Sequence, residues 1–162
     1  MSQSAAVKNS AQQFVTLGID REVFAVEVDV VREILDFRPL TKVPNTPPFV
    51  LGILDVRGRG VPVIELRAKL GLPSAEVTRQ TRIVVLEIPS DGKPLLLGLL
   101  TDRVFEVTPL GEHGLEPPPE IGVRWHSDYI RGIGRRGEDF VIILDLAHLF
   151  GSNDIALIRG EA

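Results

Sequence analysis

Short apolar runs separated by turn residues recur along this chain. The runs with strand character cover residues 14–19, 24–28, 49–54, 61–66, 81–88, 95–100 and 140–144. Within residues 24–28, one set of positions alternates with the other along the strand, as inward-facing and outward-facing residues do in a half-buried strand. Residues 81–88 instead form a nearly continuous apolar run, which is typical of a fully buried strand. Strands this short, with turn residues every 8–12 positions, predict an all-β barrel or sandwich of about ten strands.

Short helices are predicted at three points where the apolar spacing changes. Asp29 is predicted to cap the first, whose apolar positions follow helical spacing at Val30, Val31, Ile34 and Leu35. Residues 67–70 are predicted to form one helical turn that Gly71 closes. Residues 145–150 are predicted to form the last short helix, which Gly151 ends.

Neither end of the chain carries a comparable pattern. Residues 1–11 are small and polar, with no period, and are predicted to form a flexible tail. Residues 153–162 are predicted to form a second polar tail with one apolar patch at 155–158. The folded domain is therefore expected to span residues 12–152.

The apolar pattern occurs twice along the chain. At an offset of 80 residues, 49–53 (Phe-Val-x-Gly-Ile) match 129–133 (Tyr-Ile-x-Gly-Ile), and 61–66 match 141–146 without a gap. At an offset of 73, residues 25–34 match 98–107. A period this long exceeds that of solenoid repeats and indicates a duplicated small domain. The fold is therefore predicted to be two similar small β-barrels packed together, one from each half of the chain.

Composition narrows the class of protein further. The 162 residues carry a formal net charge of -4 and include 6% aromatic residues, which gives no support to binding of nucleic acid or of an anionic membrane. No apolar run approaches the ~20 residues that span a bilayer, so direct membrane insertion is not expected. The absence of cysteine excludes disulfides and thiolate metal sites and is typical of a cytosolic chain.

Positions that match between the two halves are expected to serve the shared fold. Glu65 matches Asp145, each just before a short helix, so both are interpreted as helix caps rather than as catalytic acids. Gly52 matches Gly132, and both are predicted to mark a bulge or a close backbone approach.

Positions that differ between the halves are freer to be specialised. Asp55, Arg57 and Arg59 surround glycines 58 and 60 between two strands, and their counterparts in the second half are Arg135, Gly137 and Asp139. This loop is either a solvated hairpin tip or a partner contact, since arginine on a rigid turn is favoured at interfaces.

Candidate catalytic groups are sparse. The histidines, His113, His126 and His148, have no spacing suited to a metal, and His148 is interpreted as a surface residue. Glu116 and Glu120 flank three prolines and make weak candidates for acid–base work. The sequence contains no Gly-x-Ser-x-Gly elbow, phosphate loop or dinucleotide fingerprint. The chain is therefore predicted to have no enzymatic activity and no cofactor.

Four motifs in order carry a resemblance to a known family. They are Val-Arg-Glu-Ile at 31–34, Val-Pro-Asn-Thr-Pro at 43–47, Gly-Ile-Leu-Asp-Val-Arg-Gly at 52–58 and Val-Pro-Val-Ile-Glu-Leu-Arg at 61–67. Residues 98–104, 129–132 and 143–145 add matches in the second half. Over residues 13–152 the chain thus resembles the CheW family of chemotaxis coupling proteins. It departs from the family pattern at Asp55, usually Asn, at Val56, usually Leu, and at Thr101, usually Val.

The resemblance implies a fold, a function and a set of contact residues. It implies two pseudo-symmetric five-stranded SH3-like β-barrel subdomains and a non-catalytic cytoplasmic adaptor. The partners implied are the regulatory domain of the histidine kinase CheA and the signalling tips of chemoreceptors, the latter in the groove between the barrels. The protein-binding residues expected on this basis are Val28, Val31, Glu33, Ile34, Asp55, Arg57, Gly58 and Arg59.

Two alternatives remain open at this point. Proteins similar to CheW also serve other receptor–kinase systems, such as those of type IV pili. A small-ligand-binding double barrel is the other alternative, and it would require a deep polar pocket that contains a perturbed acid or histidine.

Overall fold

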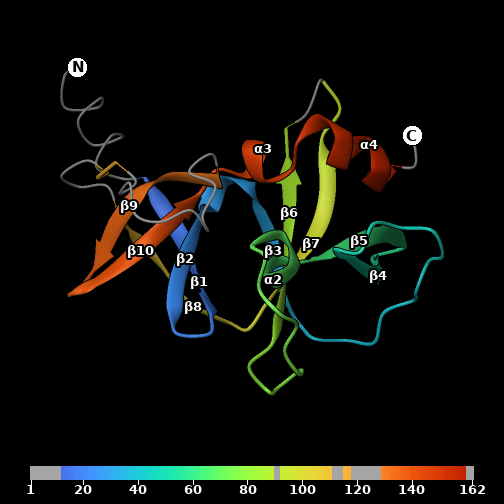
Figure 1. Ribbon diagram of the computed structural model, residues 1–162, viewed down its shortest axis with the longest axis horizontal. Coiled ribbons are helices and arrows are strands. Elements are labelled where there is room, and N and C mark those ends of the chain that lie inside the picture. The colour runs from blue at the N-terminus through green and yellow to red at the C-terminus, as the bar shows by residue number, and fades with distance from the viewer. Residues whose placement is uncertain (1–11, 90–91, 111–114, 118–128, 160–162) are drawn as a thin grey trace.

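In the part of the chain that the structure describes, ten strands form two five-stranded sheets that lie side by side (Figure 1). The computed structural model describes residues 12–89, 92–110, 115–117 and 129–159, so the predicted tail at 1–11 lies outside the described residues. The β1 sheet has the order β8-β1-β2-β10-β9, with strands Gln13–Ile19 (β1), Glu22–Glu27 (β2), Arg103–Pro109 (β8), Ile130–Arg136 (β9) and Asp139–Leu144 (β10). The β3 sheet has the order β3-β6-β7-β5-β4, with strands Val31–Asp36 (β3), Val50–Val56 (β4), Arg59–Glu65 (β5), Arg82–Ile88 (β6) and Leu95–Thr101 (β7). The predicted all-β class is confirmed.

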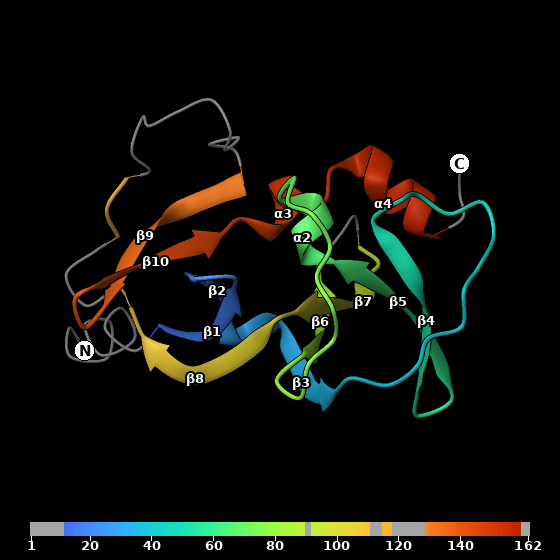
Figure 2. The same cartoon turned by 60° about the horizontal axis from the view of Figure 1, so that its bottom comes forward.

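The two sheets are copies of one five-strand arrangement. If β1–β5 are matched in order with β6–β10, the order of one sheet maps onto the order of the other. The copies exchange strands, because β2 pairs in parallel with β10 and β7 pairs in parallel with β5. Each sheet therefore takes strands from both halves of the chain, and the units do not follow the first and second halves as the sequence predicts. Figure 2 shows β8 leaving the junction of the sheets and running along the β1 sheet.

The predicted closed barrels are not formed by the described residues. Each sheet curls, but its two end strands share no ladder there. The outer edge of β4 is covered instead by the preceding connector, through paired backbone hydrogen bonds between Thr41 and Ile53 of 3.0 and 2.7 Å. Glu116 and Ile133 make the equivalent pair in the other copy, at 2.9 and 2.8 Å. Each connector thus covers part of an outer sheet edge, at one bridge of two hydrogen bonds.

The largest apolar core lies between the two sheets. It combines Leu17 and Phe24 of the β1 sheet with Ile64, Leu97 and Leu99 of the β3 sheet, all fully buried. Smaller clusters fill the inside of each curled sheet. The two sheets are therefore held together by a common interior rather than by a linker.

The predicted helix after Asp29 is wrong. Val28–Val30 form one 3-10 turn (η1), and Glu27, which holds its N-terminal position, makes no side-chain cap. The chain then continues as β3, where half-buried and exposed residues alternate and the strand pairs with β6. Periods of 2 and 3.6 overlap in so short a run, and β-branched Val30, Val31 and Ile34 favour the strand.

Two other short helices follow the fifth strand of each copy of the duplicated unit, β5 and β10. Leu66–Lys69 (α2) follows β5, and Gly71 beyond it has a left-handed φ of 75°, so the predicted turn is confirmed. Leu146–Leu149 (α3) follows β10. The predicted C-terminal tail is instead a helix, Ser152–Arg159 (α4), which lies over the β3 sheet in Figure 1. None of the helices described is long and apolar enough to cross a membrane.

Apolar packing and one buried ion pair hold α4 against the body of the protein. Ile155 and Ile158 pack against the shared core. Asp154 accepts a 2.6 Å hydrogen bond from the Lys69 ammonium, which also lies 4.7 Å from the ring centre of Phe49. Because the Lys69 side chain is only 9% exposed, this pair gives the ammonium a partner that it needs. The apolar patch at 155–158 is thus the buried face of a docked helix.

Candidate functional site

The loop between β4 and β5 is a rigid two-residue turn. Arg57 and Gly58 occupy its two central positions with positive φ of 53° and 83°, the combination of a type I′ hairpin turn. The Asp55 carboxylate accepts a 2.8 Å hydrogen bond from the Gly58 N–H, which ties the turn down. Asp55 and Gly58 therefore set the backbone from which the Arg57 side chain projects.

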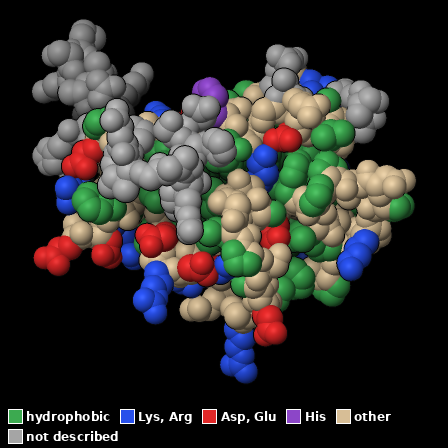
Figure 3. Space-filling model, viewed as in Figure 1, with side chains coloured by type: hydrophobic (Ala, Val, Ile, Leu, Met, Phe, Trp, Pro, Cys, Tyr) green, Lys and Arg blue, Asp and Glu red, His purple; other side chains and the backbone are tan. Residues whose placement is uncertain are grey.

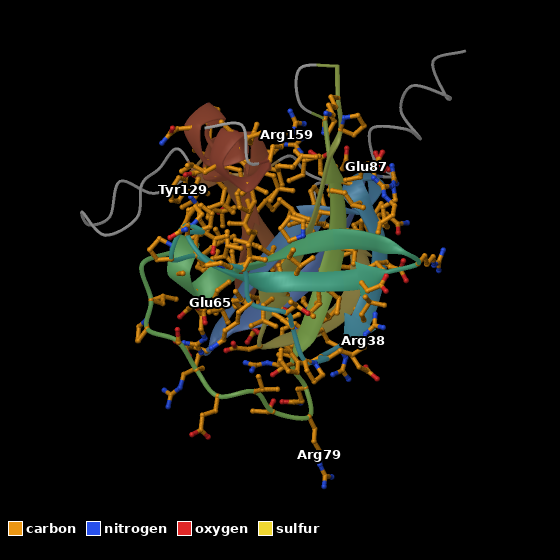
Figure 4. The ribbon with its side chains drawn as sticks, turned by 90° about the vertical axis from the view of Figure 1, so that its right-hand side faces the viewer. Arg38, Glu65, Arg79, Glu87, Tyr129 and Arg159 are labelled. Carbon is orange, nitrogen blue, oxygen red and sulfur yellow. The ribbon has the colours of Figure 1, made fainter. Side chains whose placement is uncertain are left out.

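The turn brings together two of the predicted contact residues. The Arg57 guanidinium lies 3.5 Å from the Glu33 carboxylate, and the two side chains are 83% and 26% exposed. An exposed pair of this kind stabilises a fold by only ~0–1 kcal/mol, because solvent screens it. In Figure 4 the β4–β5 hairpin points to the right, with Glu87 above its tip and Arg38 below it.

The other predicted contact residues do not share one face with this pair. Val28 and Val31 are half-buried and pack against the shared core. Ile34 is 41% exposed and lies on the opposite face of β3 from Glu33, because neighbouring side chains of a strand alternate. The structure thus groups Glu33 with Arg57 and separates Ile34 from them.

The charge of Arg59, the last of the predicted contact residues, acts on a second ion pair. Arg32 on β3 pairs with Glu87 on β6 at 3.1 Å. The hydrogen bond from Arg32 holds the pKa of the Glu87 carboxyl below its ordinary value, against the smaller effect of burial, and the charges of Arg32 and Arg59 act in the same direction. The charges of two arginines, on β3 and β5, thus act on one carboxylate of β6.

The duplication repeats the ion pair of the turn, although the turn sequences differ. Glu106, the counterpart of Glu33 at an offset of 73, lies 2.6 Å from Arg136. The counterpart of Arg57 at an offset of 80 is Gly137, so the second arginine comes from the preceding position. Arg136 also lies 4.9 Å from the ring centre of Phe105. Each sheet therefore has an arginine that reaches from a hairpin tip to a glutamate on the opposite end strand.

A buried arginine that the sequence analysis missed joins the two sheets. Arg67, in α2, donates to Asp102 through Nε at 3.0 Å and Nη2 at 2.7 Å, and Nη1 donates to the Pro73 carbonyl at 3.0 Å. Nη2 also pairs with Asp20 of the β1–β2 turn, whose own N–H donates to Asp102 at 2.8 Å. Arg67 and Asp102 both lie in the motifs that carry the sequence resemblance. Their position in these motifs is the sequence signal that could have identified them.

The ionisation of this cluster follows from its contacts. Partial burial acts to raise the pKa of the Asp102 carboxyl, but the hydrogen bonds from Arg67 and from the Asp20 N–H outweigh it. The charges of Arg67 and Arg103 add to them, and the pKa of Asp102 lies below its ordinary value. The hydrogen bond to Asp102 likewise raises the pKa of Arg67. The cluster is a salt bridge with both partners charged.

The remaining sequence predictions have mixed outcomes. A Cβ at Gly52 would lie 2.6 Å from the Thr41 carbonyl oxygen, so the predicted close backbone approach is confirmed. Asp145 caps α3 by accepting from the His148 N–H at 3.2 Å, as predicted. Glu65 makes no cap; its longer side chain accepts from the Ser74 hydroxyl at 2.9 Å.

The groups considered for catalysis lie apart. The His148 side chain is 64% exposed, which confirms it as a surface residue. His113, His126 and Glu120 lie outside the described residues, and Glu116 pairs with Arg135 at 3.2 Å. Within the described residues no group of three or more His, Asp or Glu side chains is placed to hold a metal ion.

Several hollows mark the surface. One of about 890 Å³ lies between the β1–β2 turn and the end of α2, and Leu70, Leu72 and Glu22 are among its lining residues. A small apolar hollow of about 190 Å³ lies between residues 43–50, β4–β5 and α4, with Val50, Ile158 and Leu157 in its walls. Figure 3 shows hydrophobic side chains gathered on the right of the molecule, on the side of β4 and β5.

Comparison with known proteins places the chain in a family. The family model for CheW-like domains matches residues 13–154. A chemotaxis protein CheW of Klebsiella aerogenes is 29% identical over 151 residues, which cover 93% of this chain and 89% of that protein. The protein PilI of Pseudomonas aeruginosa is 27% identical over 139 residues, covering 83% and 74%. The crystal structure of the scaffolding protein TtCheW of Thermoanaerobacter tengcongensis superposes with a TM-score of 0.76 at 31% identity, covering 88% of this chain and 90% of that one.

Proposed function

The chain belongs to the family of CheW-like domains, and from that premise we propose that it is a non-catalytic scaffold of bacterial chemotaxis. In this role it couples the cytoplasmic tips of chemoreceptors to the histidine kinase CheA. The observation that carries the proposal is the family match over residues 13–154, which includes nearly every described residue. The same match supports a cytoplasmic location as part of the proposal, with the partners joining the chain to the receptor arrays.

The Arg57–Glu33 pair supports a binding role for the β4–β5 turn. Arg57 is held on a tied turn yet is 83% exposed, so its side chain contributes little to the fold and remains available to a partner. Arginine presented in this way is a frequent hot-spot residue. We assign the pair, with Asp55, Gly58 and Arg59 around it, to the contact with the receptor or the kinase.

The proposed contacts divide between two kinds of surface. The regulatory domain of CheA has the same fold and is proposed to pair with this chain end to end. The receptor tip is proposed to lie in the groove between the two sheets, beside Val28, Val31 and Ile34. Apolar side chains there would give affinity, and the charged rim would fix the register of the receptor helices.

The family match supports a scaffold rather than an enzyme. Several acids of the described residues pair with arginine or lysine, or cap turns, and His148 is at the surface. A small-ligand-binding double barrel would need a deep polar pocket with a perturbed acid or histidine. Among the described residues, Asp102 is the acid that has both a lowered pKa and a buried partner, and its carboxylate oxygens already accept hydrogen bonds from Arg67.

The similarity to PilI keeps a second pathway as an alternative for the same scaffold role. The relatives called chemotaxis protein CheW favour chemotaxis. The two pathways differ in which kinase and receptors bind, not in the fold.

Titration calorimetry of the full chain against the isolated CheA regulatory domain, and separately against a receptor-tip fragment, tests the proposal. We expect saturable one-to-one binding of both. Binding of neither, by a folded and monodisperse sample, overturns the chemotaxis assignment. Binding only to the kinase and receptor of a pilus system transfers the scaffold to that pathway.

A further inference from the structure

The duplication gives the buried Arg67 site a second copy. Arg67 is the second residue of α2, and its counterpart at an offset of 80 is Ala147, the second residue of α3. Asp102 follows β7, and its counterpart at an offset of 73 is Asp29, in the turn that follows β2. The second copy therefore retains the carboxylate and lacks the arginine.

In the first copy the arginine fills the space between the sheets. Its side chain is 9% exposed, and the guanidinium makes its bonds to Asp102, Asp20 and the Pro73 carbonyl there. Glu65 and Asp145 precede the two helices at matched positions, so α2 and α3 leave their strands in the same way. The space that the Arg67 side chain occupies beside α2 thus has an equivalent beside Ala147 in α3.

In the second copy that space is open. A hollow of about 330 Å³ lies between η1, the end of β6 and α3, and its apolar walls are Val30, Ile88, Leu144, Leu146 and Ala147. A second hollow of about 510 Å³, lined by Asp29, adjoins it, since the two share Glu27, Val30 and Pro89. Together they form one groove, which we call the Ala147 groove. Two of the elements that line it, the end of β6 and α3, lie at the top of the molecule in Figure 1.

The charges around the Ala147 groove leave one carboxylate free. Glu27 pairs with Arg131, Glu87 with Arg32, and Asp145 with His148. Asp29 is exposed, and no cation of the described residues forms an ion pair with its carboxylate, including Lys93 of the same hollow. The groove therefore has apolar walls that lead to a single unpaired negative charge.

We propose that the Ala147 groove is a docking site for an arginine side chain of a partner protein, which takes the place that Arg67 takes in the other copy. The apolar walls accept the three methylenes of an arginine stem, and Asp29 accepts hydrogen bonds from its guanidinium. A planar guanidinium suits this site better than an ammonium, because it is more weakly hydrated and donates to a carboxylate through two parallel bonds.

The arginine belongs to a segment with apolar neighbours, because most of the lining of the inner hollow is apolar, and its charged members Glu27, Arg131 and Asp145 already have partners. The groove shares no lining residue with the set Val28, Val31 and Ile34 and adjoins the receptor contact proposed above through Asp29 and Val30, which lie between Val28 and Val31 in the chain. The inference rests on the duplication and not on the identity of the kinase or receptor.

A peptide titration followed by NMR tests the groove directly. The probe is the capped tripeptide acetyl-Leu-Arg-Leu-amide, added to the full-length ¹⁵N-labelled chain, with the neutral, isosteric citrulline peptide as its control. We expect the arginine peptide to shift the amide signals of Asp29 and Ala147, and the citrulline peptide to bind about tenfold more weakly, the value of a hydrogen bond to a charged group. Equal binding of both peptides, or shifts confined to unrelated exposed acids such as Asp36, overturns the proposal.

Two variants separate this site from non-specific attraction to an acidic protein. Asp29→Asn removes the charge from an exposed position and is expected to abolish the difference between the two peptides. Ala147→Arg supplies the missing side chain from the chain itself and is expected to block the peptide, whereas Ala147→Gln, polar but uncharged, is expected to block it less. The proposal is overturned if Ala147→Arg binds the arginine peptide as tightly as the wild type does. It is also overturned if Asp29→Asn keeps the wild-type difference in affinity between the two peptides, and this second result holds even if Ala147→Arg fails to fold.

Discussion

Arg57 lies 3.5 Å from Glu33, although the two residues belong to opposite ends of the β3 sheet. The contact shows how far the sheet curls, and the 2.6 Å pair of Arg136 and Glu106 shows the same curl in the β1 sheet. In both copies an arginine at a hairpin tip reaches the end strand without a ladder between the strands. The copy that holds Arg57 differs in having its arginine on the turn itself, where 83% of the side chain faces solvent.

Replacing Arg57 tests the role of this turn. Arg57→Ala is expected to leave the unfolding temperature nearly unchanged, since an exposed pair contributes only ~0–1 kcal/mol. It is expected to weaken receptor or kinase binding by more than ~1 kcal/mol, the scale of an interface hot spot. Thermal unfolding and titration calorimetry measure the two effects. Arg38→Ala is the matched control, because Arg38 is exposed on the same side of the molecule (Figure 4) and is not assigned to the contact. Equal affinities for wild type and Arg57→Ala would remove Arg57 from the interface.

Replacing Arg67 tests the junction between the sheets. Arg67→Ala leaves Asp102 partly buried without its partner, and the free energy of unfolding is expected to fall by ~3–5 kcal/mol. Urea unfolding at pH 7 measures the change. Arg82→Ala is the control, because it removes an arginine from an exposed pair with Asp36 on the same sheet. Similar losses for the two variants would contradict the assignment of Arg67 as the residue that joins the sheets.

The Asp102 carboxyl makes part of the stability depend on pH. Its pKa is lower in the folded than in the unfolded chain, so its contribution is present above the unfolded value of about 3.9 and is lost as the pH falls through the folded value. The wild type is therefore expected to lose stability more steeply below about pH 4 than Asp102→Asn. Urea midpoints measured between pH 7 and pH 3 give both slopes. Parallel slopes for the two proteins would show that Asp102 titrates normally.

The close approach at Gly52 predicts a local cost of adding one methyl group. Gly52→Ala places a Cβ 2.6 Å from a carbonyl oxygen of the connector that covers β4, and this backbone cannot move without breaking the bridge between Thr41 and Ile53. A loss of ~1–3 kcal/mol is expected, as for overpacking elsewhere. Gly151→Ala is the control, because, apart from the adjoining residues of the chain, no atom of the described residues lies within 4 Å of the added Cβ. A Gly52→Ala protein as stable as Gly151→Ala would mean that the connector leaves the edge of β4 readily.

The sequence predicts the strands and their duplication, but not how the duplicated strands assemble. The repeated apolar runs and the matched Gly52 and Gly132 reflect the local requirements of each strand. In the structure the runs form strands, and both glycines lie where another part of the chain comes close. The exchange of strands depends on the parallel pairs β2–β10 and β5–β7, which are long-range contacts with no local signal. The C-terminal helix was not predicted for the same reason. Residues 155–158 form a single apolar patch in the sequence, and their helix is stabilised by the core that they cover, which the sequence does not show.

For the site, the motif positions lead to Arg57 and Glu33, which the structure brings together. The helical spacing predicted for residues 30–35 does not show that Ile34 faces away from Glu33, because that depends on β3 being a strand. The Arg67–Asp102 pair escapes sequence reasoning for another reason. Its members are 35 residues apart in different motifs, and only the packing of α2 against the β7–β8 turn joins them.

The most direct test of the scaffold role is co-sedimentation of CheA kinase with vesicles that carry chemoreceptors, with and without this chain. A coupling protein is predicted to make the kinase sediment with the vesicles in proportion to the amount of chain added, and Arg57→Ala is predicted to reduce that amount while Arg38→Ala does not. Kinase that remains in the supernatant at every concentration of the folded wild-type chain would contradict the account.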